Sequence, residues 1–319
     1  MRQPRLNQLQ YYDTPTLAAQ ASADLLAPAA AVSPKFFYDA LGSRLFDAIT
    51  ELEEYYPTRT EAAIMAQHGA DMARAIHARL GPAPCLIDLG AGNCAKASRL
   101  FPALQPGRYV AVDISADYLR DALCTLQRDF PALDIFGLGL DFSERLQLPE
   151  GLIEQPSLAF YPGSSIGNFS PAQALRLLGE ARAASQGGAL LIGVDLVKDT
   201  QRLVQAYDDP LGVTAAFNLN VLGHLNRLLG ANFQLRDWQH LALFNSAHSR
   251  IEMHLVAQRS ISVSWNGGQR TFAEGERLHT ENSYKWQRAN FEALLYSAGY
   301  TQVQCWTDPQ ADFAVFLSN

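Results

Sequence analysis

The feature that most constrains the fold is an alternation, beginning at residue 85, between short apolar runs and helix-length stretches. Five of these runs have strand length: residues 85–88, 109–113, 135–138, 157–160 and 189–195. Strands that are apolar without interruption are buried on both faces, as they are in a parallel sheet covered by helices. The pattern predicts a doubly wound α/β sheet.

Helix and turn signals agree with this prediction. One crossover helix follows Gly92, another begins at Ser115, and a third begins at Ser170, where the following proline suits a first helical turn. A helix over residues 286–298 precedes two alternating runs, 302–307 and 313–317, which predict a closing antiparallel hairpin.

Residues 198–284 interrupt the alternation. They hold a helical stretch at 221–229 and two predicted antiparallel strands, 249–257 and 260–265, followed by an Asn-Gly-Gly turn. An N-terminal helix over 16–27 and a helix from about residue 58 to about 80 precede the sheet. We therefore predict a cofactor domain of residues 60–197 and 285–319, and a smaller α+β substrate domain of residues 1–59 and 198–284.

Composition excludes several classes of protein. The 25 basic and 32 acidic residues give a net charge of −7 without any basic run, which disfavours binding to nucleic acid or to an anionic membrane. No apolar run approaches the ~20 residues of a membrane-spanning helix, and Arg2 and Arg5 precede no signal-peptide core. The 4 cysteines and 7 histidines show no metal-ligand spacing. We expect a cytoplasmic monomer with reduced core thiols and no metal.

A glycine turn follows the first predicted strand of the sheet. Gly90 and Gly92 lack a Cβ, so the backbone can adopt positive φ and let a nucleotide cofactor lie against it. A dinucleotide fingerprint would require a third glycine where Ala95 stands, which disfavours a bound pyrophosphate. The turn alone is a weak signal.

Acidic residues at three successive strand ends strengthen the case. Asp113 ends the second strand, where a carboxylate can accept hydrogen bonds from both ribose hydroxyls. Asp141 and Phe142 follow the third strand and can frame an adenine. Such carboxylates suit a nucleoside with positive charge, which points to S-adenosylmethionine. Lys96 opposes the dipole of its helix, and we interpret it as the partner of the cofactor's carboxylate.

Six sequence blocks occur in order along nearly the whole chain. They are Ser33-Pro34-Lys35-Phe36-Phe37-Tyr38-Asp39, Leu52-Glu53-Glu54-Tyr55-Tyr56-Pro57-Thr58-Arg59-Thr60-Glu61, Asp88-Leu89-Gly90-Ala91-Gly92, Gly163-Ser164-Ser165-Ile166-Gly167-Asn168-Phe169, Asp195-Leu196-Val197-Lys198 and Thr280-Glu281-Asn282-Ser283. By these blocks the chain resembles the histidine-specific Nα-methyltransferases of ergothioneine biosynthesis. The second and fourth blocks are the most specific, whereas the glycine turn is common to methyltransferases.

The resemblance implies a class I methyltransferase sheet with an inserted substrate domain. It also implies three methyl transfers from S-adenosylmethionine to the α-amino group of L-histidine, giving trimethylhistidine (hercynine), the first step of ergothioneine biosynthesis. The implied cofactor residues are Gly90, Gly92, Lys96, Asp113, Asp141 and Phe142. The implied substrate residues are Tyr56, Asn168 and Tyr207 for the amino-acid end, and Glu281 and Ser283 for the imidazole.

The residue types suit these roles. The Asn168 amide can donate to a carboxylate at a strand end. Glu281 and Ser283 are two apart, so both face one way in an extended segment. Met253 can line the imidazole pocket, although core packing is the more usual role of such a residue. Tyr38 or Tyr56 can accept the proton that the substrate amine must lose before attack.

Other functions remain open at this point. The scaffold could methylate another amino acid, although Glu281 argues for an imidazole. A nucleotide-binding module without chemistry and an NAD-dependent oxidoreductase are alternatives from other classes.

Overall fold

The computed structural model describes residues 2–9 and 13–319, which divide into two compact units. The first unit comprises residues 2–9, 57–197 and 285–319, and the second comprises residues 13–56 and 198–284. The sequence analysis placed residues 1–59 together in the substrate domain, whereas residues 2–9 belong to the first unit. Residues 1 and 10–12 of that predicted range lie outside the described residues.

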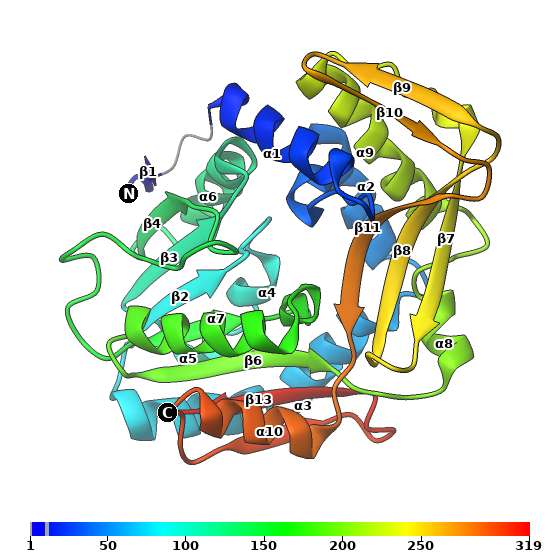
Figure 1. Ribbon diagram of the computed structural model, residues 1–319. Helices are drawn as coiled ribbons and strands as arrows, with labels where there is room; N and C mark the ends of the chain where they lie inside the picture. Colours follow the sequence, from blue (N-terminus) through cyan, green and yellow to red (C-terminus); the bar gives the residue numbers. More distant parts are fainter. Residues whose placement is uncertain (1, 10–12) are drawn as a thin grey trace. The chain divides into compact units, whose positions relative to one another are not determined.

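The first unit is built on an eight-stranded sheet in the order β1-β4-β3-β2-β5-β6-β13-β12 (Figure 1). The strands are β1 (Arg5–Gln8), β2 (Cys85–Leu89), β3 (Arg108–Asp113), β4 (Asp134–Gly139), β5 (Leu158–Tyr161), β6 (Ala189–Asp195), β12 (Gln304–Thr307) and β13 (Phe313–Ser318). The strands from β1 to β6 pair in parallel, and β13 pairs antiparallel with β6 and β12. This is the predicted class I methyltransferase sheet with its closing hairpin.

Helices cover the sheet, and its apolar strands are therefore buried. Every residue of β2, β5, β6 and β13 is buried, and α6 packs on β3 and β4 while α7 packs on β5 and β6. Helix α3 spans Tyr56–Leu80, and its residues from Pro57 onward belong to this unit. The other helices of the unit are α4 (Ala95–Ser98), α5 (Phe101–Leu104), α6 (Ala116–Asp129), α7 (Pro171–Ala184) and α10 (Arg288–Ser297), with the 3-10 helix η2 (Ser165–Asn168).

Several local predictions differ from the structure. The helix predicted after Gly92 is two single turns, α4 and α5, with Pro102 in the second. Residues 140–157, between β4 and β5, for which no helix start was predicted, hold no helix. Pro149, Gly151 and Pro156 disfavour one. Cys124 is exposed, so it is not the core thiol that we predicted. Among the described residues, no helix is long and apolar enough to cross a membrane.

The second unit combines helices with two small antiparallel sheets. The larger sheet has the order β11-β8-β7, and β9 pairs with β10 across the predicted Asn-Gly-Gly turn. Helix α9 lies at the core of the second unit. It packs against β7 and β8 and also against α1 and α2. The elements are α1 (Thr14–Leu26), η1 (Pro34–Phe37), α2 (Ala40–Thr50), α8 (Thr200–Gln205), α9 (Val213–Leu229), η3 (Leu235–Asp237), β7 (Trp238–Asn245), β8 (Arg250–Ala257), β9 (Ile261–Trp265), β10 (Gly268–Phe272) and β11 (Arg277–Tyr284).

A buried ion pair marks two places where the chain passes between the units. Asp195 ends β6, two residues before the first unit gives way to the second, and Lys285 is the first residue after the return. Lys285 Nζ lies 2.7 Å from Asp195 Oδ2, and both side chains are at most 1% exposed. Backbone hydrogen bonds from Trp286 to Asp195 and from Val197 to Trp286 hold the two segments together.

We expect Lys285→Met to destabilise the protein strongly. Removing this partner leaves the Asp195 carboxylate without its compensating charge in a site that excludes water, which costs about 3–5 kcal/mol. Replacing both residues by apolar ones, as in Asp195→Leu with Lys285→Met, should recover most of that loss. Urea denaturation of the three proteins measures this. A loss below about 1 kcal/mol in the single variant would contradict the assignment.

Candidate functional site

The order of the sheet locates a crevice. β2 and β5 are neighbours, but the chain leaves β2 toward β3 and reaches β5 only after β4, so the strand order reverses between them. Open α/β sheets bind ligands at such a switch point, beyond the carboxyl ends of the strands. Gly90 directly follows β2, and Gly163 follows β5 by two residues.

The glycine turn at this edge is held by the end of β3. Gly90 and Gly92 have φ of 74° and 52°, which an L side chain rarely adopts. The N–H groups of Gly90 and Ala91 both donate to the Val112 carbonyl, at 2.8 and 3.1 Å. The Phe142 ring lies beside the turn, since a Cβ at Gly90 would be 3.8 Å from its Cζ. The glycine turn, the end of β3 and the Phe142 ring therefore lie together at the switch point.

Two of the predicted carboxylates are fixed by backbone donors. Asp113 accepts hydrogen bonds from the N–H of Gly92 at 2.8 Å and of Ser115 at 2.9 Å. Burial raises the pKa of Asp113, and these donors oppose that shift. Asp141 accepts from the backbone N–H and the hydroxyl of Ser143, at 2.9 and 2.5 Å. A carboxylate offers about four acceptor sites, so Asp113 retains capacity for a ligand.

Lys96 has a carboxylate partner within the protein. Its Nζ lies 3.1 Å from Oε2 of Glu61, whose side chain is 2% exposed. Glu61 Oε1 accepts from the N–H of Gly163 at 2.7 Å, and a Cβ at Gly193 would meet that oxygen at 1.9 Å. The sequence analysis took Glu61 as part of a helix start and sought the partner of Lys96 in the cofactor. The structure shows that this ion pair joins α4 to α3, and that Glu61 is also bound to the loop after β5.

Asp88 is a residue of the site that the sequence analysis did not select. It is 1% exposed, and its Oδ2 accepts from the Tyr109 hydroxyl at 2.7 Å. Its Oδ1 is buried and has no hydrogen-bond partner among the described residues. Burial raises the pKa of Asp88 to about 7. Its position two residues before Gly90 was the available signal, but a strand-end acid in an apolar run also has a structural explanation.

A β-bulge orients the residues expected to bind the imidazole. The register of β11 against β8 shifts between His279 and Glu281, so Glu281 pairs with Met253 and Ser283 with Ile251. Opposite residues of an antiparallel pair share a face, and Met253 and Ile251 face the core of the second unit. Glu281 and Ser283 therefore lie on that face, both less than 10% exposed. Without the extra residue, Glu281 would face the other way.

Tyr207 and Tyr38 lie along the same core. The Tyr207 hydroxyl donates to Ser283 Oγ at 2.7 Å, and its ring makes an edge contact with Tyr55. Tyr55 contacts Phe46, which contacts Tyr38. Tyr207, Ser283, Glu281 and Met253 are thus brought together within the second unit, and a row of rings connects them to Tyr38.

Tyr56 makes a separate contact in the second unit. Its side chain is 1% exposed, and its hydroxyl oxygen accepts a hydrogen bond from Lys198 Nζ at 2.7 Å. Lys198 belongs to one of the sequence blocks, but the sequence analysis gave it no role. Asn168 is half-buried in η2 of the first unit, in the loop after β5.

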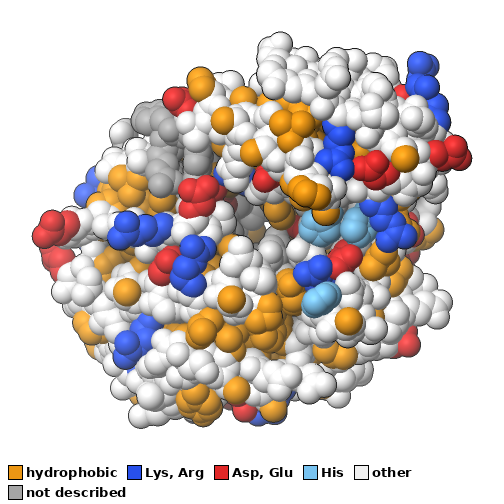
Figure 2. Space-filling view, viewed as in Figure 1, with side chains coloured by type: hydrophobic (Ala, Val, Ile, Leu, Met, Phe, Trp, Pro, Cys, Tyr) orange, Lys and Arg blue, Asp and Glu red, His pale blue; other side chains and the backbone are white. Residues whose placement is uncertain are grey.

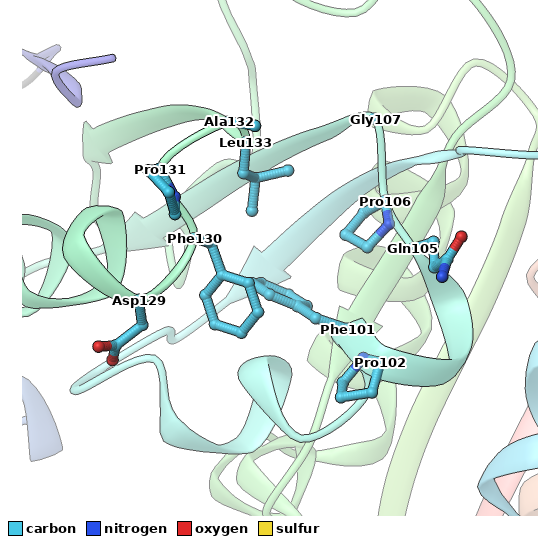
Figure 3. A pocket seen from close by; sticks show the side chains of 10 residues that line it. All are labelled: Phe101, Pro102, Gln105, Pro106, Gly107, Asp129, Phe130, Pro131, Ala132 and Leu133. Carbon is cyan, nitrogen blue, oxygen red and sulfur yellow. The ribbon is translucent and has the colours of Figure 1, made fainter. Parts of the chain in front are cut away.

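A pocket at the opposite edge of the sheet contains none of the predicted residues. It has a volume of about 540 Å³ and lies where β3 and β4 begin. The rings of Phe101 and Phe130 face it (Figure 3). Figure 2 shows acidic and basic side chains interspersed on the face in view, so that face carries no stripe of one charge. Within residues 2–9 and 13–319, no three His, Cys, Asp or Glu side chains are grouped as metal ligands.

Comparison with known proteins agrees with this geometry. A family model described as histidine-specific methyltransferase, SAM-dependent, matches residues 17–319. Histidine N-alpha-methyltransferase of Mycolicibacterium smegmatis is 41% identical to this chain. The alignment covers 95% of this chain and 94% of the relative's length. The protein of the same name from Mycobacterium tuberculosis is also 41% identical and covers 89% of each chain.

Among solved structures, an S-adenosylmethionine-dependent methyltransferase from Clostridium acetobutylicum aligns with 88% of this chain and 96% of its own, at 12% identity and a TM-score of 0.46. The family model covers nearly the whole chain and includes both units. The chain therefore belongs to the family of histidine-specific, S-adenosylmethionine-dependent methyltransferases.

Proposed function

We propose that the protein transfers three methyl groups from S-adenosylmethionine to the α-amino nitrogen of L-histidine, giving trimethylhistidine for ergothioneine biosynthesis. The observation that carries this proposal is the placement of Glu281 and Ser283 on one buried face, beside Tyr207, in a chain of the histidine-specific family. A carboxylate and a hydroxyl two residues apart can hold the two ring nitrogens of an imidazole.

The residues at the switch point fit S-adenosylmethionine. A cation or a donor would satisfy the orphaned oxygen of Asp88, and the sulfonium nucleoside carries positive charge. The Gly90 turn leaves its backbone open to a ligand, Asp113 retains acceptor capacity for ribose hydroxyls, and Phe142 offers a ring face beside the turn. When bound, the cofactor supplies an electrophilic methyl group.

Lys96 has a modified role in this proposal. The Lys96 side chain is 34% exposed while its ammonium contacts Glu61. It can therefore hold the cofactor's carboxylate without leaving that partner. The pair together carries no net charge, which limits the repulsion between Lys96 and the sulfonium.

The chain's own residues act mainly by positioning. Methyl transfer needs the amine lone pair aligned with the bond that breaks, and holding reactants in that geometry removes much of the barrier. Tyr56, Asn168 and Tyr207 would hold the amino-acid end of histidine. Glu281 and Ser283 would hold its ring. Fixing both ends of the substrate sets the direction of its nitrogen.

Mass spectrometry tests the function directly. The purified protein, incubated with S-adenosylmethionine and all twenty amino acids, should convert histidine alone, to a product with three added methyl groups. Titration calorimetry should show binding of S-adenosylmethionine and none of NAD. Methylation of a different amino acid, or binding of NAD instead, would replace this proposal with one of the alternatives.

Asp88 should make cofactor binding depend on pH. Its raised pKa of about 7 means that the carboxylate is half protonated near neutrality. A cationic ligand favours the ionised form, so affinity for S-adenosylmethionine should rise with pH from 6 to 7.5 and be about tenfold weaker at pH 6 than its limiting value. Asp88→Asn should bind weakly and lose this dependence. Equal slopes in the two proteins, by calorimetry, would remove Asp88 from the account.

Glu281 should determine specificity. Glu281→Ala leaves an imidazole N–H unpaired in a buried pocket, which should cost about 1–3 kcal/mol in histidine binding. The ratio of kcat/KM for histidine over phenylalanine should fall, while affinity for S-adenosylmethionine stays unchanged. Glu281→Gln serves as the matched control because it keeps the size and one acceptor. An unaltered ratio would show that the imidazole is recognised elsewhere.

A further inference from the structure

The contact between Lys198 and Tyr56 has no role in the function described so far. Lys198 Nζ donates to the Tyr56 hydroxyl oxygen at 2.7 Å and lies 4.4 Å from the ring centroid. The Arg202 guanidinium carbon lies 4.8 Å from the same centroid. Two cations therefore contact one phenol that is 1% exposed.

The backbone around Lys198 is fixed on both sides. Val197 donates a backbone hydrogen bond to Trp286 at 3.0 Å. Asp199 caps α8 by accepting the N–H of Arg202, also at 3.0 Å. The lysine backbone thus lies between an anchored segment and a helix start, which limits where its side chain begins.

An ammonium at a phenolic oxygen has a chemical consequence. A hydrogen bond donated to the charged form of an acid stabilises that form, and a nearby cation acts in the same direction. Inside a protein, where the surroundings are less polar than water, both effects are larger than in solution. The Lys198 ammonium thus favours the phenolate of Tyr56 over the phenol.

We propose that Lys198 is a positioning residue that makes Tyr56 the acceptor of the proton released by the substrate's α-ammonium group. This inference rests on the proposed function, because it assigns Tyr56 to the amino-acid end of the substrate. In the step, an N–H bond of the ammonium breaks and an O–H bond forms on the phenolate. The electron pair stays on the nitrogen, which becomes a neutral nucleophile, and the phenol returns its proton to water before the next methylation.

The assignment chooses between the two tyrosines considered from the sequence. The Tyr38 ring packs edge-on against Phe46 and Phe217, as a core aromatic does. The Tyr56 oxygen accepts a hydrogen bond from a cation. Such a contact lowers the proton affinity of a phenolate toward that of an amine. Arg202 adds a second positive charge over the ring but is not the donor that we assign.

A spectroscopic titration tests the pair without requiring turnover. Tyrosinate absorbance is recorded against pH for the wild type and Tyr56→Phe, and their difference isolates Tyr56 from the protein's 12 tyrosines. The same difference is recorded in the Lys198→Met background. We expect the Tyr56 midpoint to rise by about one pH unit or more when Lys198 is lost, and Lys198→Arg to restore most of it. A midpoint unchanged in Lys198→Met overturns the proposal.

Kinetics provide the second readout. The dependence of kcat on pH is measured at saturating histidine and S-adenosylmethionine. In Lys198→Met, the acidic limb of this profile should move to higher pH by the same amount as the spectroscopic midpoint. KM for histidine should change less than kcat. Arg202→Met is the matched control, which removes a cation from the ring while keeping the Lys198 hydrogen bond, and it should move the limb less than half as far. A lower rate with an unmoved limb in Lys198→Met would reduce Lys198 to a structural role.

The two proposals fail in different ways. If the wild type methylates no histidine, the proposed function is wrong whatever the titration shows. If histidine is trimethylated but the Tyr56 midpoint is the same with and without Lys198, only the present inference is wrong.

Discussion

The buried ion pair between Asp195 and Lys285 is the constraint on which the arrangement of functional residues depends. Burying two charges is favourable only when their geometry is good, and here the atoms are 2.7 Å apart at the ends of two chain segments. Lys198 follows Asp195 by three residues, and Ser283 and Glu281 precede Lys285 by two and four. The pair thus fixes the starting points of two segments. One carries Lys198, the partner of Tyr56, and the other carries the side chains that we propose for imidazole binding.

The first unit gathers carboxylates where few cations balance them. Asp88, Asp113 and Asp141 lie at the ends of β2, β3 and β4, and Glu61 is buried close by. Burial raises the pKa of Asp88 and Asp113, which means that it disfavours their ionised forms. A positively charged ligand would relieve this electrostatic cost.

The sheet could be predicted from the sequence because its signal is local. Continuous apolar runs show burial on both faces, and the runs at 302–307 and 313–317 showed the antiparallel hairpin. β1 carried no such signal, since three of its four residues are exposed and it joins the sheet by backbone pairing at the edge. β11 was missed as a strand because it includes the polar residues Glu281, Asn282 and Ser283.

The placement of a candidate site residue was predictable where it follows from that residue's own position in the sequence. It was less predictable where the placement depends on a partner far away in the chain. The glycine turn and Asp113 are adjacent to the strands that place them. The partner of Lys96 is Glu61, 35 positions away in the chain, and the contact of Lys198 with Tyr56 spans 142 positions. Neither pairing leaves a periodic pattern. The bulge in β11 likewise depends on register against β8, which spacing within one strand does not reveal.

The most direct test of this account is a crystal structure with S-adenosylhomocysteine and L-histidine bound. The account predicts ribose hydroxyls within hydrogen-bond distance of Asp113, adenine beside Phe142, and the imidazole nitrogens on Glu281 and Ser283. A nucleoside bound away from the glycine turn, or an imidazole held by other side chains, would contradict it.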